Sequence, residues 1–353
     1  MRLKVLAVHC FLIFILLSCT PDIQPPEQTS LFVYRFDPPA FVEYTEDFQA
    51  VNEIPFSIPP GCALFDVFSP TVGPSLLVEL SCPNGQTVLF LDTVSESFTQ
   101  PVTDSDSHFL AWAGDGRSAY LKVDSLGDAR LVRAHVAGKP QDIKITGWTY
   151  DLSSKPFSDD FLFTFSRGLG YGSELHSAQG GGRDSKLLYE DPFNYISFAR
   201  YSPDGSRIAF IKIPDSQTPF TVGELWVMDA DGSNPHKLAE ADAGNGYAAN
   251  WSPDGEWIAF VKRENPQDEN ADRSSDLLIS NLYLVNVQSG GLKQVTSLTN
   301  GRVETPHWSP AGNTLAFNLV LNGRMEVQTA DIPSGEIRPL TTGPSCCPAW
   351  LRK

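Results

Sequence analysis

The side chains with catalytic potential in this chain are spread thinly along it. Beyond the N-terminal region, the histidines are His108, His135, His176, His236 and His307. No two of them have a metal-binding spacing such as His-Glu-x-x-His, and no Gly-x-Ser-x-Gly nucleophile motif or phosphate-holding glycine-rich loop with lysine occurs. We therefore expect no catalytic site, no metal site and no cofactor. Carboxylates or histidines that distant segments bring together stay open as an alternative.

The acidic residues are numerous, but their local spacing is typical of turns. Asp229 and Asp231 precede a glycine in Asp-Ala-Asp-Gly-Ser-Asn, where aspartate caps a turn more often than it binds calcium. The 42 acidic and 26 basic residues give a formal net charge of −16. That charge argues against a nucleic-acid partner, because binding phosphates requires clustered lysine and arginine. The hydrophobic fraction of 41% excludes global disorder.

The N-terminus has the features of an export signal. Arg2 and Lys4 precede an apolar run from Val5 to Leu17, which is too short to span a membrane as a helix. The run ends in Leu-Leu-Ser-Cys at residues 16–19 and resembles a bacterial lipobox, which implies cleavage before Cys19 and attachment of a lipid to its thiol. An ordinary secretory signal is the alternative. We assign residues 1–18 to the signal peptide and residues 19–30 to the lipidated cysteine and a proline-rich tether.

An internal repeat is the strongest pattern in the remaining sequence. Tyr201, Trp251 and Trp308 each open an aromatic-Ser-Pro-(Asp/Ala)-Gly segment followed by a run ending in Ala-Phe, and Trp112 opens a degenerate copy. Ser-Pro-Asp-Gly is a tight turn, since proline fixes φ and glycine accepts a positive φ. The flanking runs are rich in strand-forming residues. The repeat predicts four-stranded antiparallel meanders, which form a β-propeller when arranged radially.

The repeated string resembles the TolB family of β-propellers, a WD-like repeat. Its parts are Ser-Pro-Asp-Gly, Ile-Ala-Phe, Leu-Trp-Val-Met-Asp and Asp-Gly, and the strong copies lie between about residues 195 and 340. The resemblance implies that a partner protein or peptide docks at one end of the central channel. TolB-like propellers also occur fused to hydrolase domains, but here the chain ends with the ring, so we expect no such domain.

Counting inner strands favours seven blades. Inner strands are expected to end near Phe68, Trp112, Leu152, Tyr201, Trp251 and Trp308, and residues 345–350 align with residues 303–308 as a seventh copy. The partners of this last strand are expected from the N-terminus, in Leu31–Phe36, Phe41–Thr45 and Phe48–Ile54. One blade built from both ends would close the ring and remove its free edge. We predict one all-β propeller domain over residues 31–353, with six blades as the alternative.

Four cysteines remain in the expected mature chain, and we predict that they form disulfides. Phe68 and Leu76 flank a hairpin turn, which places Cys62 opposite Cys82 at a distance that a disulfide can bridge. Two buried thiols are the alternative for this pair. Cys346 and Cys347 are adjacent in sequence and either form a vicinal disulfide or pair elsewhere, with a structural role at ring closure.

Polar residues on the expected inner strands are the candidates for binding at the channel mouth. They are His108, Arg200, Asn250, Arg302, Glu304 and His307. His307, beside Trp308 in a short polar run, is the best single candidate. The polar insertion Lys262 to Ser275 is expected to form a loop that could gate one face.

The sequence thus favours a non-catalytic, monomeric lipoprotein outside the cytoplasm, facing the periplasm or the cell surface. Its expected partners are a protein, peptide or glycan and, through Cys19, the membrane. The alternative is a propeller enzyme, a lyase or glycoside hydrolase, that uses carboxylates or histidines at the channel mouth.

Overall fold

The computed structural model describes residues 29–352, except for 104–105, 126–127, 137, 146–148, 169, 216–220 and 243–247. The expected signal peptide, the lipidation site Cys19 and the tether up to residue 28 lie outside the described residues. The first strand begins at Thr29, two residues before the start expected for the propeller.

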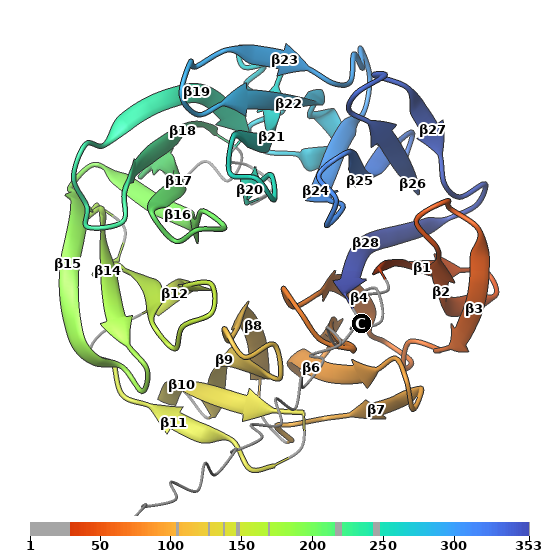
Figure 1. The fold of residues 1–353 in the computed structure, drawn as a ribbon, viewed down its shortest axis with the longest axis horizontal. Helices are drawn as coiled ribbons and strands as arrows, with labels where there is room; N and C mark the ends of the chain where they lie inside the picture. Colours follow the sequence, from red (N-terminus) through yellow and green to blue (C-terminus); the bar gives the residue numbers. More distant parts are fainter. Residues whose placement is uncertain are drawn as a thin grey trace, which may run out of the picture.

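Seven four-stranded antiparallel sheets are arranged around a central axis as the blades of a propeller, as predicted (Figure 1). We call the space along this axis, which the inner strands line, the channel. We number the blades from the first one that is continuous in sequence. Blade 1 holds β4 (Ala63–Phe68), β5 (Ser75–Cys82), β6 (Gly85–Asp92) and β7 (Ser97–Thr99). Blade 2 holds β8 (Asp106–Trp112), β9 (Ser118–Ser125), β10 (Asp128–His135) and β11 (Gln141–Ile143). Blade 3 holds β12 (Thr149–Ser154), β13 (Phe161–Phe165), β14 (Ser173–Gln179) and β15 (Arg183–Asp191).

The strong sequence copies form the next three blades. Blade 4 holds β16 (Asn194–Tyr201), β17 (Arg207–Pro214), β18 (Val222–Asp229) and β19 (His236–Asp242). Blade 5 holds β20 (Asn250–Trp251), β21 (Trp257–Arg263), β22 (Ser280–Asn286) and β23 (Leu292–Gln294), with the 3-10 helix η1 (Ser275–Leu277) between β21 and β22. Blade 6 holds β24 (Arg302–Trp308), β25 (Thr314–Leu321), β26 (Arg324–Asp331) and β27 (Ile337–Pro339). None of the described helices has the length and apolar character needed to cross a membrane.

Blade 7 is built from both ends of the described chain, which confirms the predicted ring closure. Its inner strand is β28 (Ser345–Arg352), and its other strands are β1 (Thr29–Phe36), β2 (Pro39–Tyr44) and β3 (Ala50–Pro55). β28 pairs with β1 from Thr29 opposite Arg352 to Arg35 opposite Ser345. No blade is left without an inner strand, so the seven-bladed prediction is correct and the six-bladed alternative is wrong.

Apolar packing and repeated tryptophans join neighbouring blades. One buried apolar cluster lies at each interface between blades, so every sheet buries both faces. The indole N–H of Trp251 donates to the carbonyl of Arg200 at 3.1 Å, and that of Trp308 donates to the carbonyl of Asn250 at 3.1 Å. The repeated aromatic residue therefore ties each of these inner strands to the preceding one.

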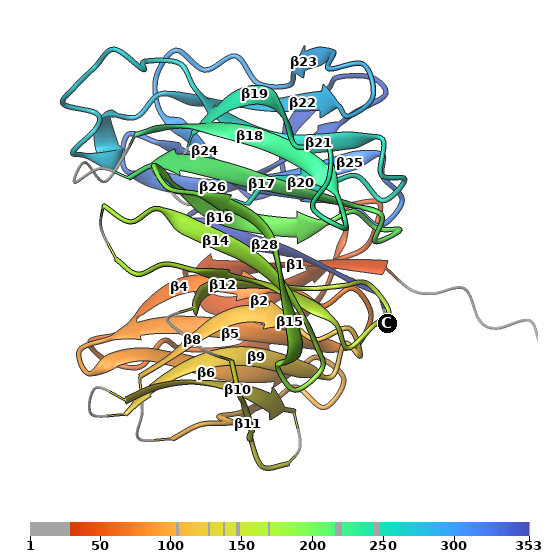
Figure 2. The same cartoon turned by 90° about the vertical axis from the view of Figure 1, so that its left-hand side faces the viewer.

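The ring has two different faces, which Figure 2 shows from the side. Inner strands begin at the face that carries the β21–β22 insertion, which we call the insertion face, and they end at the face of the Ser-Pro-Asp-Gly turns, which we call the turn face. In these turns Ser202 and Ser252 donate to Asp204 and Asp254. The serine and aspartate of the repeated motif therefore bond to each other within each turn.

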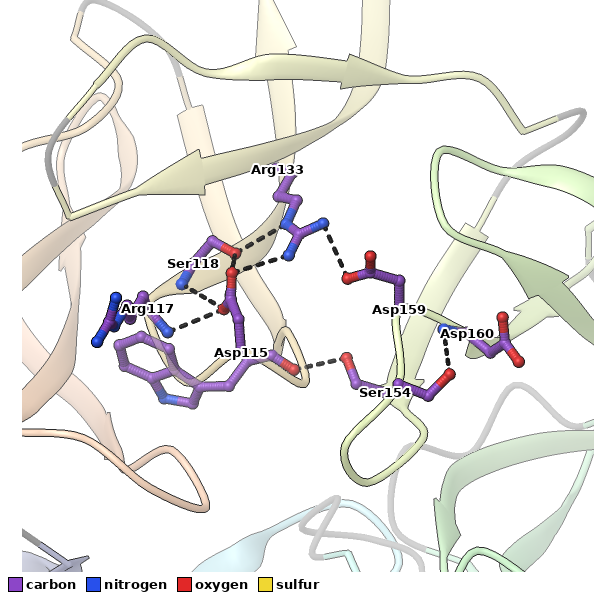
Figure 3. A network of polar contacts seen from close by, with 9 residues as sticks. Asp115, Arg117, Ser118, Arg133, Ser154, Asp159 and Asp160 are labelled. Atoms are coloured by element: carbon purple, nitrogen blue, oxygen red, sulfur yellow. Dashed lines mark hydrogen bonds and ion pairs between the residues drawn. The ribbon is translucent and has the colours of Figure 1, made fainter.

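The degenerate turn of blade 2 uses a different set of contacts (Figure 3). Asp115 accepts hydrogen bonds from the backbone N–H groups of Arg117 and Ser118. Arg133 donates to Asp115 and Ser118 at 2.8 Å each and forms a salt bridge of 3.2 Å with Asp159 in the turn of blade 3. This side-chain network replaces the missing serine of the repeat and joins two blades.

Glycine lets neighbouring turns come into contact around the channel. A Cβ atom at Gly116 would lie 2.0 Å from the carbonyl oxygen of Val72 in blade 1. A Cβ atom at Gly114 would lie 2.2 Å from the carbonyl oxygen of Ser158 in blade 3. The turns of blades 1, 2 and 3 therefore pack backbone to backbone, which a larger residue would prevent.

The structure confirms the disulfide between Cys62 and Cys82, whose Cα atoms are 4.1 Å apart. The expected register near the turn was wrong by one residue, because Phe68 pairs with Leu77 rather than with Leu76. A bulge at Phe65 inserts one extra residue and restores the register that places the cysteines opposite each other. Cys346 and Cys347 form a vicinal disulfide, buried between blades 7 and 1.

Candidate functional site in the central channel

The bulge in β4 gives the channel its most exposed aromatic ring among the described inner-strand residues. Phe65 has no partner on β5, because Leu64 pairs with Leu80 and Asp66 pairs with Glu79. The Phe65 side chain is 61% exposed although blades pack on both sides of its strand. An exposed residue in the middle of an inner strand, with blades packed on both sides, faces the channel, so the bulge directs Phe65 into it.

Asp66 follows Phe65 and supplies a carboxyl group at the same place. In the described part of the chain its side chain accepts a hydrogen bond from the backbone N–H of Val67 at 2.7 Å and forms no salt bridge. The pKa of Asp66 is raised to about 7, chiefly by burial and also by the charges of Glu79 and Glu304, while the hydrogen bond from Val67 lowers it. Asp66 is therefore an uncompensated carboxyl group that exchanges its proton near neutral pH.

Behind Asp66, a buried glutamate orients a histidine of the next blade. Glu79 is 2% exposed, and its Oε1 lies 3.3 Å from Nδ1 of His108. The other oxygen accepts the backbone N–H of Phe109 at 3.3 Å. Nε2 of His108 lies 3.4 Å from Asp106, and the hydrogen bond to Glu79 raises the pKa of His108. The predicted residue His108 thus lies between two carboxylates that favour its protonated form.

Two other predicted residues come together at the start of β24. Arg302 donates to Glu304 at 2.6 Å and to the carbonyl of Ser275 at 3.1 Å. Ser275 ends the predicted insertion, which folds around Arg263. That side chain is completely buried and pairs with Asp272. The insertion therefore contacts the insertion-face end of the channel through Arg302.

The remaining predicted residues lie near the other end of their inner strands. Arg200 pairs with Asp151 at 3.0 Å, and the Asn250 side chain donates to the carbonyl of Pro306. His307 is partly buried, and desolvation lowers its pKa to about 4, so it is neutral at physiological pH. The six predicted residues are all on inner strands, but they do not share one mouth.

Sequence reasoning missed Phe65, Asp66 and Glu79. One signal was present, because Glu79 interrupts an otherwise apolar run from Leu76 to Leu80 and a buried acid needs a partner. The bulge at Phe65 had no such signal, since it is visible only once the strands are paired.

The site combines an aromatic ring with a carboxyl group, a set of groups that suits binding. Over the described residues, no three His, Cys, Asp or Glu side chains come together as ligands for a metal ion. A ring beside a carboxylate can hold an apolar or cationic side chain by stacking, cation–π attraction and charge.

Comparisons with known proteins agree with the fold. Residues 205–351 match the family model described as TolB beta propeller domain. The protein Atu1656 of Agrobacterium fabrum is 27% identical over 212 residues, which are 58% of this chain and 63% of that protein. The Tol-Pal system protein TolB of Ruthia magnifica is 21% identical over 217 residues, 61% of this chain and 46% of that protein. The chain thus covers less than two thirds of these curated relatives.

A solved structure supports the same architecture. The oligogalacturonate lyase of Vibrio parahaemolyticus superimposes with a TM-score of 0.61 at 13% identity, covering 88% of each chain. At this identity the likeness concerns the fold alone. Residues 205–351 thus match the TolB beta propeller domain, and they lie within a seven-bladed β-propeller that the whole described chain forms.

Proposed function

We propose that this propeller is a non-catalytic lipoprotein that works outside the cytoplasm and binds a protein or peptide partner in its channel. The observation that carries the proposal is the exposed Phe65 ring beside the uncompensated carboxyl group of Asp66. Aromatic residues that are held in place contribute strongly to recognition because little side-chain entropy is lost on binding. The disulfide between Cys62 and Cys82 supports an oxidising compartment.

The channel proposal is tested by selecting phage-displayed peptides against the purified ring. Peptides that bind the wild type are then measured against the variants Phe65→Ala and Asp66→Asn. We expect Phe65→Ala to weaken binding by about tenfold, as for loss of an aromatic contact at the centre of an interface. The control is Phe157→Ala, since Phe157 is 81% exposed in the β12–β13 turn and lies on a different blade from Phe65. Peptides insensitive to both channel variants would contradict the proposal, and a glycan screen with the same variants tests the other ligand class.

The lipid anchor is tested separately. We expect Cys19→Ser to release the full-length protein from the membrane fraction into the soluble fraction. A variant that still sediments with membranes would show that the lipobox interpretation is wrong.

A propeller enzyme is the second candidate, because the pKa of Asp66 near 7 suits a general acid or base. The lyase and glycoside hydrolase alternatives are tested with acidic and neutral oligosaccharides. An activity that Asp66→Asn abolishes, while the fold is retained, would replace the binding proposal.

A further inference from the structure

The described chain begins on the turn face. Thr29, the first residue of β1, pairs with Arg352 at the end of β28. The carbonyl of Arg352 accepts the backbone N–H of Gly73 at 3.0 Å, and its guanidinium donates to the carbonyl of Pro310, so both residues belong to turns of this face. In Figure 2, β1 starts on the side where β28 ends.

The distance to the lipidation site makes the turn face the nearer one to a membrane. Cys19 lies ten residues before Thr29. Even in the extended polyproline II form, a chain of that length spans about 31 Å, at about 3.1 Å per residue. An eight-residue strand such as β1 is about 27 Å long, so a tether that starts on the turn face would use nearly its whole length to pass the ring and reach the insertion face.

Large apolar side chains project from the turns on that same face. Phe157 is 81% exposed, Val94 is 73% exposed and Val72 is 43% exposed. Their turns are held by hydrogen bonds: the backbone N–H of Ser158 donates to Lys155, and Asp92 accepts the backbone N–H of Val94. Exposed apolar groups on ordered turns suit contact with a lipid surface, where burial of their side chains is favourable.

We infer that the anchored ring lies with its turn face on the bilayer, and that Phe157, Val94 and Val72 contact the lipid interface. This orientation rests on the lipid anchor of the proposed function. It leaves the insertion face, with Phe193 79% exposed and Tyr171 68% exposed, open to the partner. The contact is shallow, because acidic residues such as Asp159 and Asp160 flank Phe157 and anionic headgroups repel them.

The experiment uses full-length acylated protein in vesicles of phosphatidylethanolamine with a minor fraction of phosphatidylglycerol. Phe157→Cys supplies a thiol for a nitroxide label, since Cys62, Cys82, Cys346 and Cys347 are paired in disulfides. Phe193→Cys is the matched control on the opposite face. Collision of the label with oxygen, which concentrates in lipid, is compared with collision with a water-soluble nickel chelate.

We expect the ratio of oxygen to nickel collisions to be several-fold higher at residue 157 than at residue 193. Val94→Cys provides a second turn-face position and should behave like residue 157. A bound protein whose labels at 157 and 94 are as accessible to nickel as the label at 193 would overturn the orientation alone. Protein that does not bind the vesicles would overturn the lipid anchor and the orientation with it.

Discussion

Replacing Asp66 by asparagine should stabilise the protein, and more so as the pH rises. In the folded state burial raises the pKa of Asp66 from 3.8 to about 7, so the folded protein holds this proton more tightly than the unfolded chain. The contribution of Asp66 to the free energy of unfolding is therefore most favourable below pH about 4. It falls as the pH rises towards 7 and is constant above that value.

The magnitude follows from the size of the shift. A pKa raised by about three units corresponds to about 4 kcal/mol, at 1.36 kcal/mol per unit. Water in the channel reaches part of the side chain, and this screening reduces the cost to about 2–4 kcal/mol at pH 8. Asparagine has nearly the same shape and no charge, so Asp66→Asn should recover that free energy at pH 8 and almost none at pH 4.

Urea unfolding of both proteins from pH 4 to pH 8, with the disulfides intact, measures the difference directly. Other titrating groups are common to both proteins and cancel in the comparison. Asp47→Asn, an exposed aspartate in the turn after β2, is the control and should show no such trend. A stability difference for Asp66→Asn that does not change with pH would refute the reasoning about burial.

Two further predictions concern the turns and the buried glutamate. Gly116→Ala should lower the free energy of unfolding by at least about 2 kcal/mol more than Gly290→Ala, because both have positive φ but only the Gly116 site meets a neighbouring carbonyl. Equal losses in thermal or urea unfolding would contradict the packing argument. The imidazole of His108 should titrate above pH 6.5 by NMR, with Glu79 and Asp106 favouring the proton and Lys122 opposing it. Protonated His108 contributes fully to the free energy of unfolding below the pKa that it has in the unfolded chain, and this contribution is lost as the pH rises through its pKa in the folded protein. The loss of unfolding free energy in His108→Gln should therefore become smaller towards pH 8.

The blade count and the ring closure could be predicted because the repeats carry them directly. Trp251 and Trp308 open units whose turns and strands recur at aligned positions, and residues 345–350 extend the series. A sequence repeat of this kind implies one similar structural unit for each copy, so the number of blades can be counted without knowing how their side chains pack. The pairing of Cys62 with Cys82 was predicted from the hairpin register, and it holds because the bulge at Phe65 offsets the one-residue error at Phe68.

The site itself was largely hidden, because it depends on irregularities within the strands. The bulge at Phe65 moves one side chain into the channel, and it shifts the pairing of Phe68 by one residue. Arg200 and His307 lie on inner strands, as predicted. They lie near the ends of their strands, whereas His108 lies near the start of its strand, so they are at different heights along the channel axis. Partners such as Glu79 and His108 come from different blades, so no local pattern links them.

Blade 7 has a consequence for how the ring is made. β1, β2 and β3 leave the ribosome first among the described strands, whereas their inner partner β28 is made last. During synthesis β1 therefore presents an unpaired edge whose residues Leu31 to Tyr34 are almost completely buried in the finished ring. An apolar edge of this kind invites pairing with other chains. The protein is therefore most prone to aggregate in the interval between synthesis of β1 and synthesis of β28. A chaperone that binds β1 during this interval must dissociate before β28 can pair with β1 and close the ring.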